Sequence, residues 1–213
     1  MVATTKTHVR EALLSFEPDR FTSHFVLDRV PWFWPDRSSY VEWKCELAAG
    51  LDVDPYAIVV VGSACTGVTL NPNKELFREF TPKSDIDVAI VSSYHFELAW
   101  KTLREMGSRG HIPTASERRA RKKHRSYLVF DGTIATDWIL RDLPFGKAWQ
   151  AAFDAAELKL PMSGSHEVKG RIYRDLQDLR AYQVNNIERL KKDLSIPGDD
   201  IDEGEGEPLP VSD

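Results

Sequence analysis

The stretch VVVGSACTGVTLNPNKELFREFTPKSDIDVAIVS, residues 59–92, decides the fold that we expect for this chain. It begins as an apolar run, breaks at a Gly-Ser pair, and returns as the largely apolar segment SDIDVAIV, which carries Asp85 and Asp87. Residues two apart in a strand share a face, so these two carboxylates would lie side by side. Like charges held together are unfavourable unless a cation lies between them. Mg²⁺ is the ion that we expect there, because it takes hard oxygen ligands and leaves positions for phosphate oxygens.

The composition is that of an ordinary globular protein. The 213 residues, 42% hydrophobic and 29% charged, suffice for one domain or two small ones. No apolar run approaches the ~20 residues of a membrane span, and the N-terminus lacks the apolar core of a secretory signal. The two cysteines have no metal-ligand spacing. We therefore expect a cytoplasmic, reduced protein without a membrane partner.

The chain divides into four expected parts. Residues 1–37 would form an N-terminal helix and an irregular packing segment rich in aromatic residues and proline. Residues 38–145 would form the core of the fold, and residues 146–197 a C-terminal helical segment. Residues 198–213 hold seven acids and no base, which turns a body of net charge +2 into a chain of −5. That composition predicts a disordered tail.

Periodicity and turn residues predict the individual elements. The expected helices cover residues 4–16, 39–50, 96–106, 148–158 and 166–194, the second of them opened by a capping box at Ser39. The expected strands cover residues 56–61 and 85–92, with a tight turn at 62–67 and a short helix around 74–80 between them. A hairpin is expected from strands 126–130 and 133–140 around Asp131-Gly132. His124 and His166 are expected at the surface.

A third carboxylate, Asp137, lies in the second strand of the expected hairpin. A lone carboxylate in an apolar strand is unfavourable unless it is paired or ligated, and a neighbouring strand that carries Asp85 and Asp87 would explain it. Three carboxylates would hold two divalent ions, roughly 3.5–4 Å apart. Asp142 is a rival for this position, but a surface ion pair with Arg141 explains it adequately.

This chemistry suits phosphoryl or nucleotidyl transfer. One ion lowers the pKa of an attacking hydroxyl, and the other neutralises charge on a triphosphate. Gly62 at a strand end would let the backbone approach phosphate closely, and Ser63 would add donors. The basic run at residues 116–125, just before Asp137, is either a solvated helix face or a contact for triphosphate or a nucleic-acid backbone.

The ordered combination of Gly62-Ser63, the segment SDIDV and a downstream Asp137 resembles the nucleotidyltransferase superfamily of DNA polymerase beta. The resemblance covers about residues 38–140. It implies an α+β fold with a small mixed, twisted sheet flanked by helices, to which this chain would add a long C-terminal helix. The chain departs from many minimal members in the loop after Ser63, because the D-x-D segment begins 22 positions later.

The resemblance also implies the site. Asp85, Asp87 and Asp137 would be the catalytic metal ligands for Mg²⁺ or Mn²⁺. The nucleotide, ATP among the candidates, would contact Gly62, Ser63, Lys83 and Ser84.

The activity that follows is template-independent transfer of a nucleoside monophosphate from an NTP or dNTP to a hydroxyl acceptor. The chain is too small for template-reading domains. The acceptor stays open between a nucleotide or oligonucleotide, as in bacterial antiviral signalling, an RNA 3′ end, a protein side chain in a toxin–antitoxin pair, and a small hydroxylated drug. The basic run favours a nucleotide. The competing hypothesis is a non-catalytic binding module that uses the C-terminal helix and the acidic tail as protein-partner surfaces.

Overall fold

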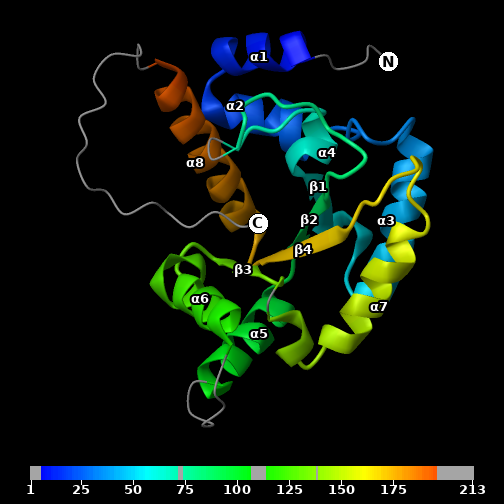
Figure 1. The fold of residues 1–213 in the computed structure, drawn as a ribbon, viewed down its shortest axis with the longest axis vertical. Helices are drawn as coiled ribbons and strands as arrows, with labels where there is room; N and C mark the ends of the chain where they lie inside the picture. The colour runs from blue at the N-terminus through cyan, green and yellow to red at the C-terminus, as the bar shows by residue number, and fades with distance from the viewer. Residues whose placement is uncertain (1–5, 72–73, 107–113, 138, 196–213) are drawn as a thin grey trace.

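The structure, a computed structural model, describes residues 6–71, 74–106, 114–137 and 139–195. It has an α+β fold in which helices lie on both faces of a four-stranded mixed sheet (Figure 1). The strands are β1 (Ile58–Val61), β2 (Ile86–Val91), β3 (Thr133–Ala135) and β4 (Val168–Tyr173). Their order is β1-β2-β4-β3; β2 and β4 run parallel, and the two outer pairs are antiparallel. The α+β class is therefore confirmed, and the polymerase beta-like topology stays a prediction.

The helices of the described residues surround this sheet. The α-helices are α1 (Lys6–Ser15), α2 (Pro18–Thr22), α3 (Arg37–Leu51), α4 (Gly62–Thr66), α5 (Ser93–Met106), α6 (Ala115–Lys123), α7 (Gly146–Glu157) and α8 (Leu176–Ser195). Short helical turns of other types are η1 (Ser23–Leu27), η2 (Pro55–Ala57), η3 (His124–Leu128) and η4 (Leu140–Asp142). No helix in this part of the chain combines the length and the apolarity that crossing a membrane would need.

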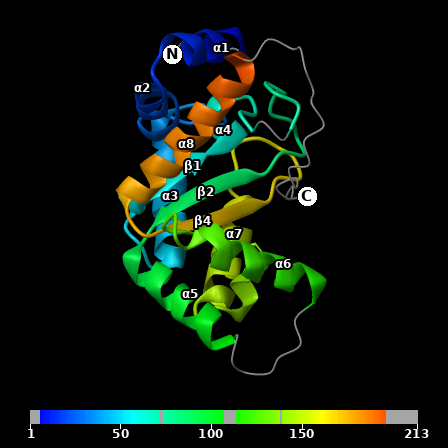
Figure 2. The same cartoon turned by 90° about the vertical axis from the view of Figure 1, so that its left-hand side faces the viewer.

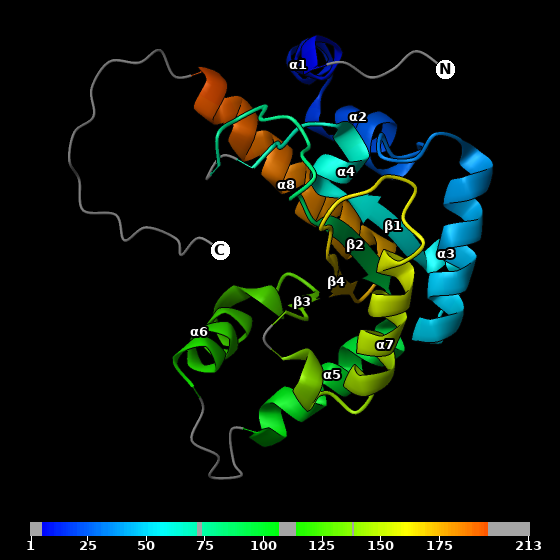
Figure 3. The ribbon, with the colours of Figure 1, turned by 45° about the vertical axis from the view of Figure 1, so that its right-hand side comes forward.

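One face of the sheet packs on α3, α5 and α7. Every second residue of the strands enters this core, as the period of a strand requires. These strand residues are Ile58, Val60, Ile86, Val88, Ile90, Ile134, Val168 and Ile172. Helices α3 and α7 lie side by side (Figure 3). The indole N–H of Trp43 on α3 donates to the Ala156 carbonyl at 3.0 Å, and that of Trp149 on α7 donates to the Leu51 carbonyl at 3.1 Å.

The other face is only partly covered. Helix α8 crosses it, with α1 and α2 beyond (Figure 2). The apolar strand residues on this side, Val61, Ala89 and Tyr173, pack with Leu179 and other residues of α8. Arg180 ties α8 to α2 through an ion pair with Asp19 at 3.0 Å. The remaining part of this face carries the polar residues described in the next subsection.

The long C-terminal helix expected at residues 166–194 is wrong in its first part. Residues 168–173 form β4, which lies inside the sheet between β2 and β3, and the helix begins only at Leu176. Val168 and Ile172 fit helical spacing, but with Gly170 between them they also fit the period of a strand. The segment 146–197 is therefore not wholly helical.

The hairpin expected at residues 126–140 is also wrong. Residues 124–128 form the helical turn η3, and β3 ends at Ala135 and pairs with β4 instead. The turn expected at 62–67 is largely the short helix α4, and no helix forms over 74–80. Asp36, rather than Ser39, caps α3 by accepting from the Ser39 N–H at 2.9 Å.

Several other expectations are confirmed. Helices α1, α5 and α7 and strands β1 and β2 lie where the pattern predicts them, within a few residues at their ends. The aromatic segment packs into the core through Phe21, Phe25, Phe33 and Trp34, although residues 18–27 are helical rather than irregular. The acidic tail lies outside the described residues.

Candidate functional site

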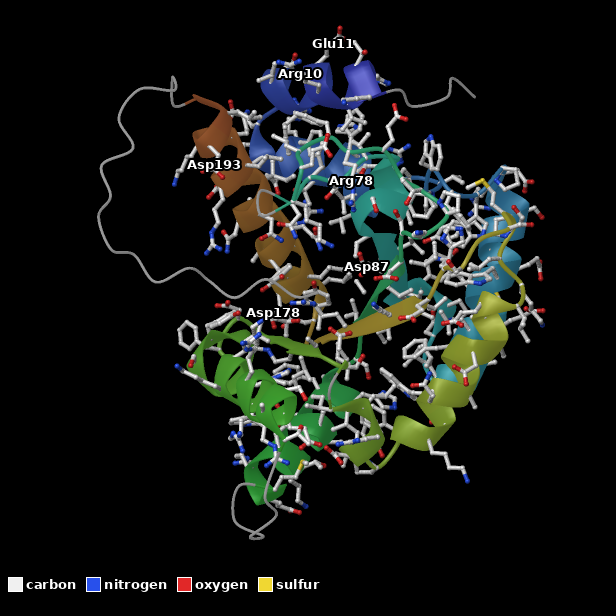
Figure 4. The ribbon with its side chains drawn as sticks, viewed as in Figure 1. Arg10, Glu11, Arg78, Asp87, Asp178 and Asp193 are labelled. Carbon is white, nitrogen blue, oxygen red and sulfur yellow. The ribbon has the colours of Figure 1, made fainter. Side chains whose placement is uncertain are left out.

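Strand β2 and the residue before it place two carboxylates on the partly covered face of the sheet. Ile86 and Val88 enter the core on the opposite side, so Asp85 and Asp87 share the other face. Asp87 is exposed in an otherwise buried strand, and it lies near the middle of the molecule (Figure 4). An exposed acid at the centre of a buried strand has no role in packing, which makes this position a candidate site.

Two bases of β4 lie on the same face. The parallel register places Lys169 beside Asp87 and Arg171 beside Ala89. Sequence reasoning missed Lys169 and assigned Arg171 to a helix. The signal that would have found them is the alternation in VKGRIY, residues 168–173, in which apolar or small residues alternate with charged ones.

Lys169 contacts Asp85 directly. Its ammonium donates to Asp85 Oδ2 at 2.8 Å and lies 3.3 Å from Glu167 Oε2. Burial acts to lower the pKa of Lys169, but the hydrogen bonds and charges of Asp85 and Glu167 together outweigh it and raise that pKa. Lys169 therefore stays charged and neutralises part of the acidic cluster.

Asp137 lies just beyond β3 and not inside a strand. It is exposed in a turn. Thr136 still contacts β4, because its hydroxyl donates to the Gly170 carbonyl at 2.6 Å. Asp137 follows Thr136, and its charge acts on both Asp87 and Arg171. The structure therefore brings Asp137 near the other acids, although the strand expected to carry it is absent.

Arg171 adds a fixed positive charge beside the acids. Its guanidinium donates to the Tyr182 hydroxyl at 3.0 Å and lies 5.0 Å from the centre of the Tyr182 ring. Burial acts to lower the pKa of Arg171, whereas Tyr182 and Tyr173, and then Asp137 and Asp87, raise it, and the balance is a raised pKa. The half-buried side chain is thus held in place from α8 while its charge acts on the carboxylates.

The pKa of Asp87 reflects the burial and the charges around it. The pKa of Asp87 is raised to about 6: desolvation is the main cause, the charges of Asp85 and Asp137 act in the same direction, and those of Arg171 and Lys74 oppose it. The side chain is nevertheless exposed to water. Water access weakens the desolvation. A carboxylate that is costly to ionise in the ligand-free protein is suited to receive a positive charge.

The Gly62-Ser63 pair lies against Asp87. Val61, the last residue of β1, pairs with Asp87 across the sheet, and Gly62 then turns the chain into α4 with φ +66°. A Cβ atom on Gly62 would lie 2.7 Å from Asp87 Oδ2. Glycine is therefore required here both by its backbone angle and by the neighbouring carboxylate. Ser63 is half-buried at the start of α4.

Lys83 and Ser84 lie in the turn that leads into β2. The Ser84 hydroxyl accepts from the Thr81 N–H at 3.0 Å. The backbone carbonyl of Ser84 accepts from the His166 Nδ1–H at 2.7 Å. His166 is buried against Phe33, which corrects the expectation of a surface histidine. These contacts hold the start of β2 in place, and Lys83 is exposed beside it.

The carboxylates fit a cation that arrives with phosphate. Among the described residues, no three or more His, Cys, Asp or Glu side chains are grouped to hold a metal ion. Asp85 and Asp87 would supply two carboxylates, which is what Mg²⁺ commonly takes from protein when phosphates and water complete its shell. The three-carboxylate, two-ion arrangement stays a prediction.

The basic run forms α6, which begins with a capping box between Thr114 and Glu117. Glu117 and Ala120 are buried, and the exposed side of the helix carries basic residues. His124 follows; its Nδ1–H donates to the Ala120 carbonyl at 2.7 Å, and its Nε2 accepts from the Ala135 N–H at 3.1 Å. His124 is therefore buried, contrary to expectation, and it joins α6 to the end of β3.

Comparison with known proteins adds no family. No protein-family model, no curated protein and no solved structure matches the chain. Function has to be inferred from the geometry of the site.

Proposed function

We propose that the chain is a metal-dependent nucleotidyltransferase. It would transfer a nucleoside monophosphate from a nucleoside triphosphate to a hydroxyl acceptor and release pyrophosphate. The observation that carries the proposal is that three acids and two bases lie around Asp87, beside Gly62. These residues are Asp85, Asp87, Asp137, Lys169 and Arg171.

The acids and bases suit the two charges of a metal–triphosphate complex. Asp85 and Asp87 would hold Mg²⁺ or Mn²⁺, and this ion would neutralise charge on the triphosphate and on the leaving pyrophosphate. Arg171 would bind phosphate oxygens through its planar fork of N–H donors. Gly62 leaves the backbone beside Asp87 without a side chain, so phosphate could approach it closely.

Asp137 is suited to the acceptor. In the transfer, the acceptor oxygen bonds to the α-phosphorus, the bond from that phosphorus to the pyrophosphate oxygen breaks, and the acceptor loses its proton. Asp137 is exposed and follows β3, which pairs with β4 on the side opposite to β2. It would receive that proton or hold an ion that favours its loss. The exposed bases of α6 favour a nucleotide or oligonucleotide as the acceptor.

Pyrophosphate release tests the proposal. The full chain is incubated with each NTP and dNTP in turn, with Mg²⁺ or Mn²⁺, and pyrophosphate and labelled products are measured. We expect release with at least one nucleotide, loss of release in Asp87→Ala, and near wild-type release in Asp142→Asn. Release that survives in Asp87→Ala would show that the reaction does not use this site.

One observation favours a second function, a non-catalytic binding protein. Lys169 already contacts Asp85 at 2.8 Å, so one of the two expected metal ligands has a protein partner. If that ion pair is permanent, the site would bind an anionic partner without chemistry. Absence of pyrophosphate release with every nucleotide, combined with retained nucleotide binding, would favour this function.

A further inference from the structure

Lys169 lies where the proposed function requires a cation. Its ammonium is 2.8 Å from Asp85 Oδ2 and 3.3 Å from Glu167 Oε2, and the sheet register places it beside Asp87. Two acids, Asp85 and Glu167, therefore contact the ammonium, and a third, Asp87, is the strand partner of Lys169. The ligand-free site is in this way supplied with a positive charge from its own strand β4.

This ion pair differs from an ordinary surface pair. Lys159 and Glu46, at the same distance of 2.8 Å, are both more than half exposed and join the turn after α7 to α3. Lys169 and Asp85 are each 37% exposed; Lys169 lies in β4, and Asp85 directly precedes β2, the parallel neighbour of β4. Exposed pairs hold their geometry weakly, whereas this pair is less exposed and its lysine is fixed within the sheet.

We propose that Lys169 is the counter-ion of the ligand-free site and competes with the divalent cation for Asp85. The inference rests on the proposed function only in assuming that the site binds a divalent cation. An ammonium and a divalent ion on the same carboxylate repel each other strongly at contact distance. Cation binding therefore requires Lys169 to leave Asp85, which the flexible four-carbon stem of lysine permits. Lys169 is thus a positioning residue that sets the affinity of the site for metal.

The consequence is that removal of the Lys169 charge strengthens metal binding. If Lys169 served only the fold, its substitution would loosen the pairing of β2 with β4 and would weaken metal binding or leave it unchanged. A nearby charge shifts proton affinity at a carboxylate by about 10- to 1,000-fold, and a metal ion responds to the same field. We expect Lys169→Met to raise the affinity for Mn²⁺ by about tenfold or more.

Mn²⁺ titration of the full chain without nucleotide, followed by the electron paramagnetic resonance signal of free Mn²⁺, tests this. Lys169→Met should bind more tightly than wild type, and Lys169→Arg, which keeps the charge, should not. Lys159→Met is the matched control and should match wild type. In an Asp85→Asn background, Lys169→Met should give no gain, because the competition acts through Asp85. Lys169→Gln replaces Lys169→Met if the latter fails to fold.

The inference is overturned if folded Lys169→Met or Lys169→Gln binds Mn²⁺ no more tightly than wild type. It is also overturned if no variant binds Mn²⁺. Pyrophosphate release by wild type separates this outcome from the proposed function. If release occurs but the substitutions give no gain, only the role of Lys169 fails. If the gain appears without release, the counter-ion role stands and the transferase proposal fails.

Discussion

A side chain at Gly62 would meet the carboxylate of Asp87 and displace it. A Cβ atom at Gly62 would lie 2.7 Å from Asp87 Oδ2, and the residue has a φ of +66°. Gly67, at the other end of α4, has the same kind of constraint, with φ +81° and the Trp32 ring 2.9 Å from a hypothetical Cβ. The two glycines therefore share a backbone requirement, but only Gly62 adjoins the carboxylates.

This pair gives the first prediction. Gly62→Ala and Gly67→Ala should each lower the free energy of unfolding by about 1–2 kcal/mol, because alanine is strained at positive φ. Gly62→Ala should in addition displace Asp87 and lower kcat by about 100-fold, which is the effect of small misplacements at reacting centres. Urea unfolding and pyrophosphate release measure the two effects. Equal losses of activity in the two variants would contradict a specific role for Gly62.

The ligand-free protein should be stabilised by neutralising Asp87. Its raised pKa means that, from about pH 4 to pH 6, the folded state keeps a proton that the unfolded chain has lost, so stability falls as pH rises through this window. Asp87→Asn removes this loss. We expect a gain of about 1 kcal/mol at pH 7.5, after allowance for the exposure of the carboxylate, and little difference at pH 4.

Thermal unfolding at the two pH values checks this result. Asp85→Asn is the contrasting variant, because it removes the ion pair with Lys169, and it should give no such gain. A lower Tm for Asp87→Asn at pH 7.5 would show that the carboxylate stabilises the fold.

Asp137→Asn should impair turnover more than nucleotide binding. Asparagine keeps the shape of the side chain but loses the charge that would act on the acceptor. We expect kcat to fall by about 100-fold while the Kd for the nucleotide changes little. Asp142→Asn is the matched control, since Asp142 lies 3.9 Å from Arg141 and has no described contact with the site. If Asp142→Asn lost activity and Asp137→Asn did not, Asp142 rather than Asp137 would be the third carboxylate.

His124 should make the fold sensitive to mild acid. Burial is the main cause of its lowered pKa, so the unfolded chain, in which histidine titrates near 6.5, binds the proton more readily. The stability contributed by neutral His124 is complete above pH 6.5 and is lost as the pH falls below it. Protonation would also remove the Nε2 acceptor of the Ala135 N–H.

The variant His124→Gln tests this sensitivity. It should be less stable than wild type at pH 7.5 by about 1 kcal/mol, because it alters two hydrogen bonds. It should lose less stability than wild type between pH 7 and pH 5, as urea unfolding at each pH would show. Parallel stability curves for the two proteins would exclude His124 as the titrating group.

The five bases of α6, three exposed and two half-buried, should bind a polyanion. Replacing the five bases Arg118, Arg119, Arg121, Lys122 and Lys123 with glutamine should weaken binding of a fluorescein-labelled oligoadenylate and reduce its salt dependence, because fewer counterions are released. The charge-matched control replaces five exposed bases on other helices, Lys6, Arg10, Arg37, Lys101 and Lys147. Equal effects of the two sets, measured by anisotropy at several salt concentrations, would make α6 an ordinary solvated face.

Local pattern alone determined the centre of this protein. The alternation of Asp85 and Asp87 with Ile86 and Val88 assigns the two acids to one face and the apolar residues to the other, whatever the strand pairs with. The apolar run before Gly62 likewise predicts β1, because a short β-branched run that ends at a glycine has few alternatives. These features depend on neighbours in sequence, so the sequence by itself determines them.

Only the tertiary structure decided what faces the acids. The sequence of residues 168–173 fits both a helix and a strand. These residues form β4 because they pair in parallel with β2, on the side of β2 that β1 does not occupy. That pairing brings Lys169 to Asp85 from 84 residues away in the chain. Asp137 similarly reaches the site through the pairing of β3 with β4, and not through the expected hairpin. Contacts between segments far apart in sequence follow from how the sheet is completed, and no local periodicity carries that information.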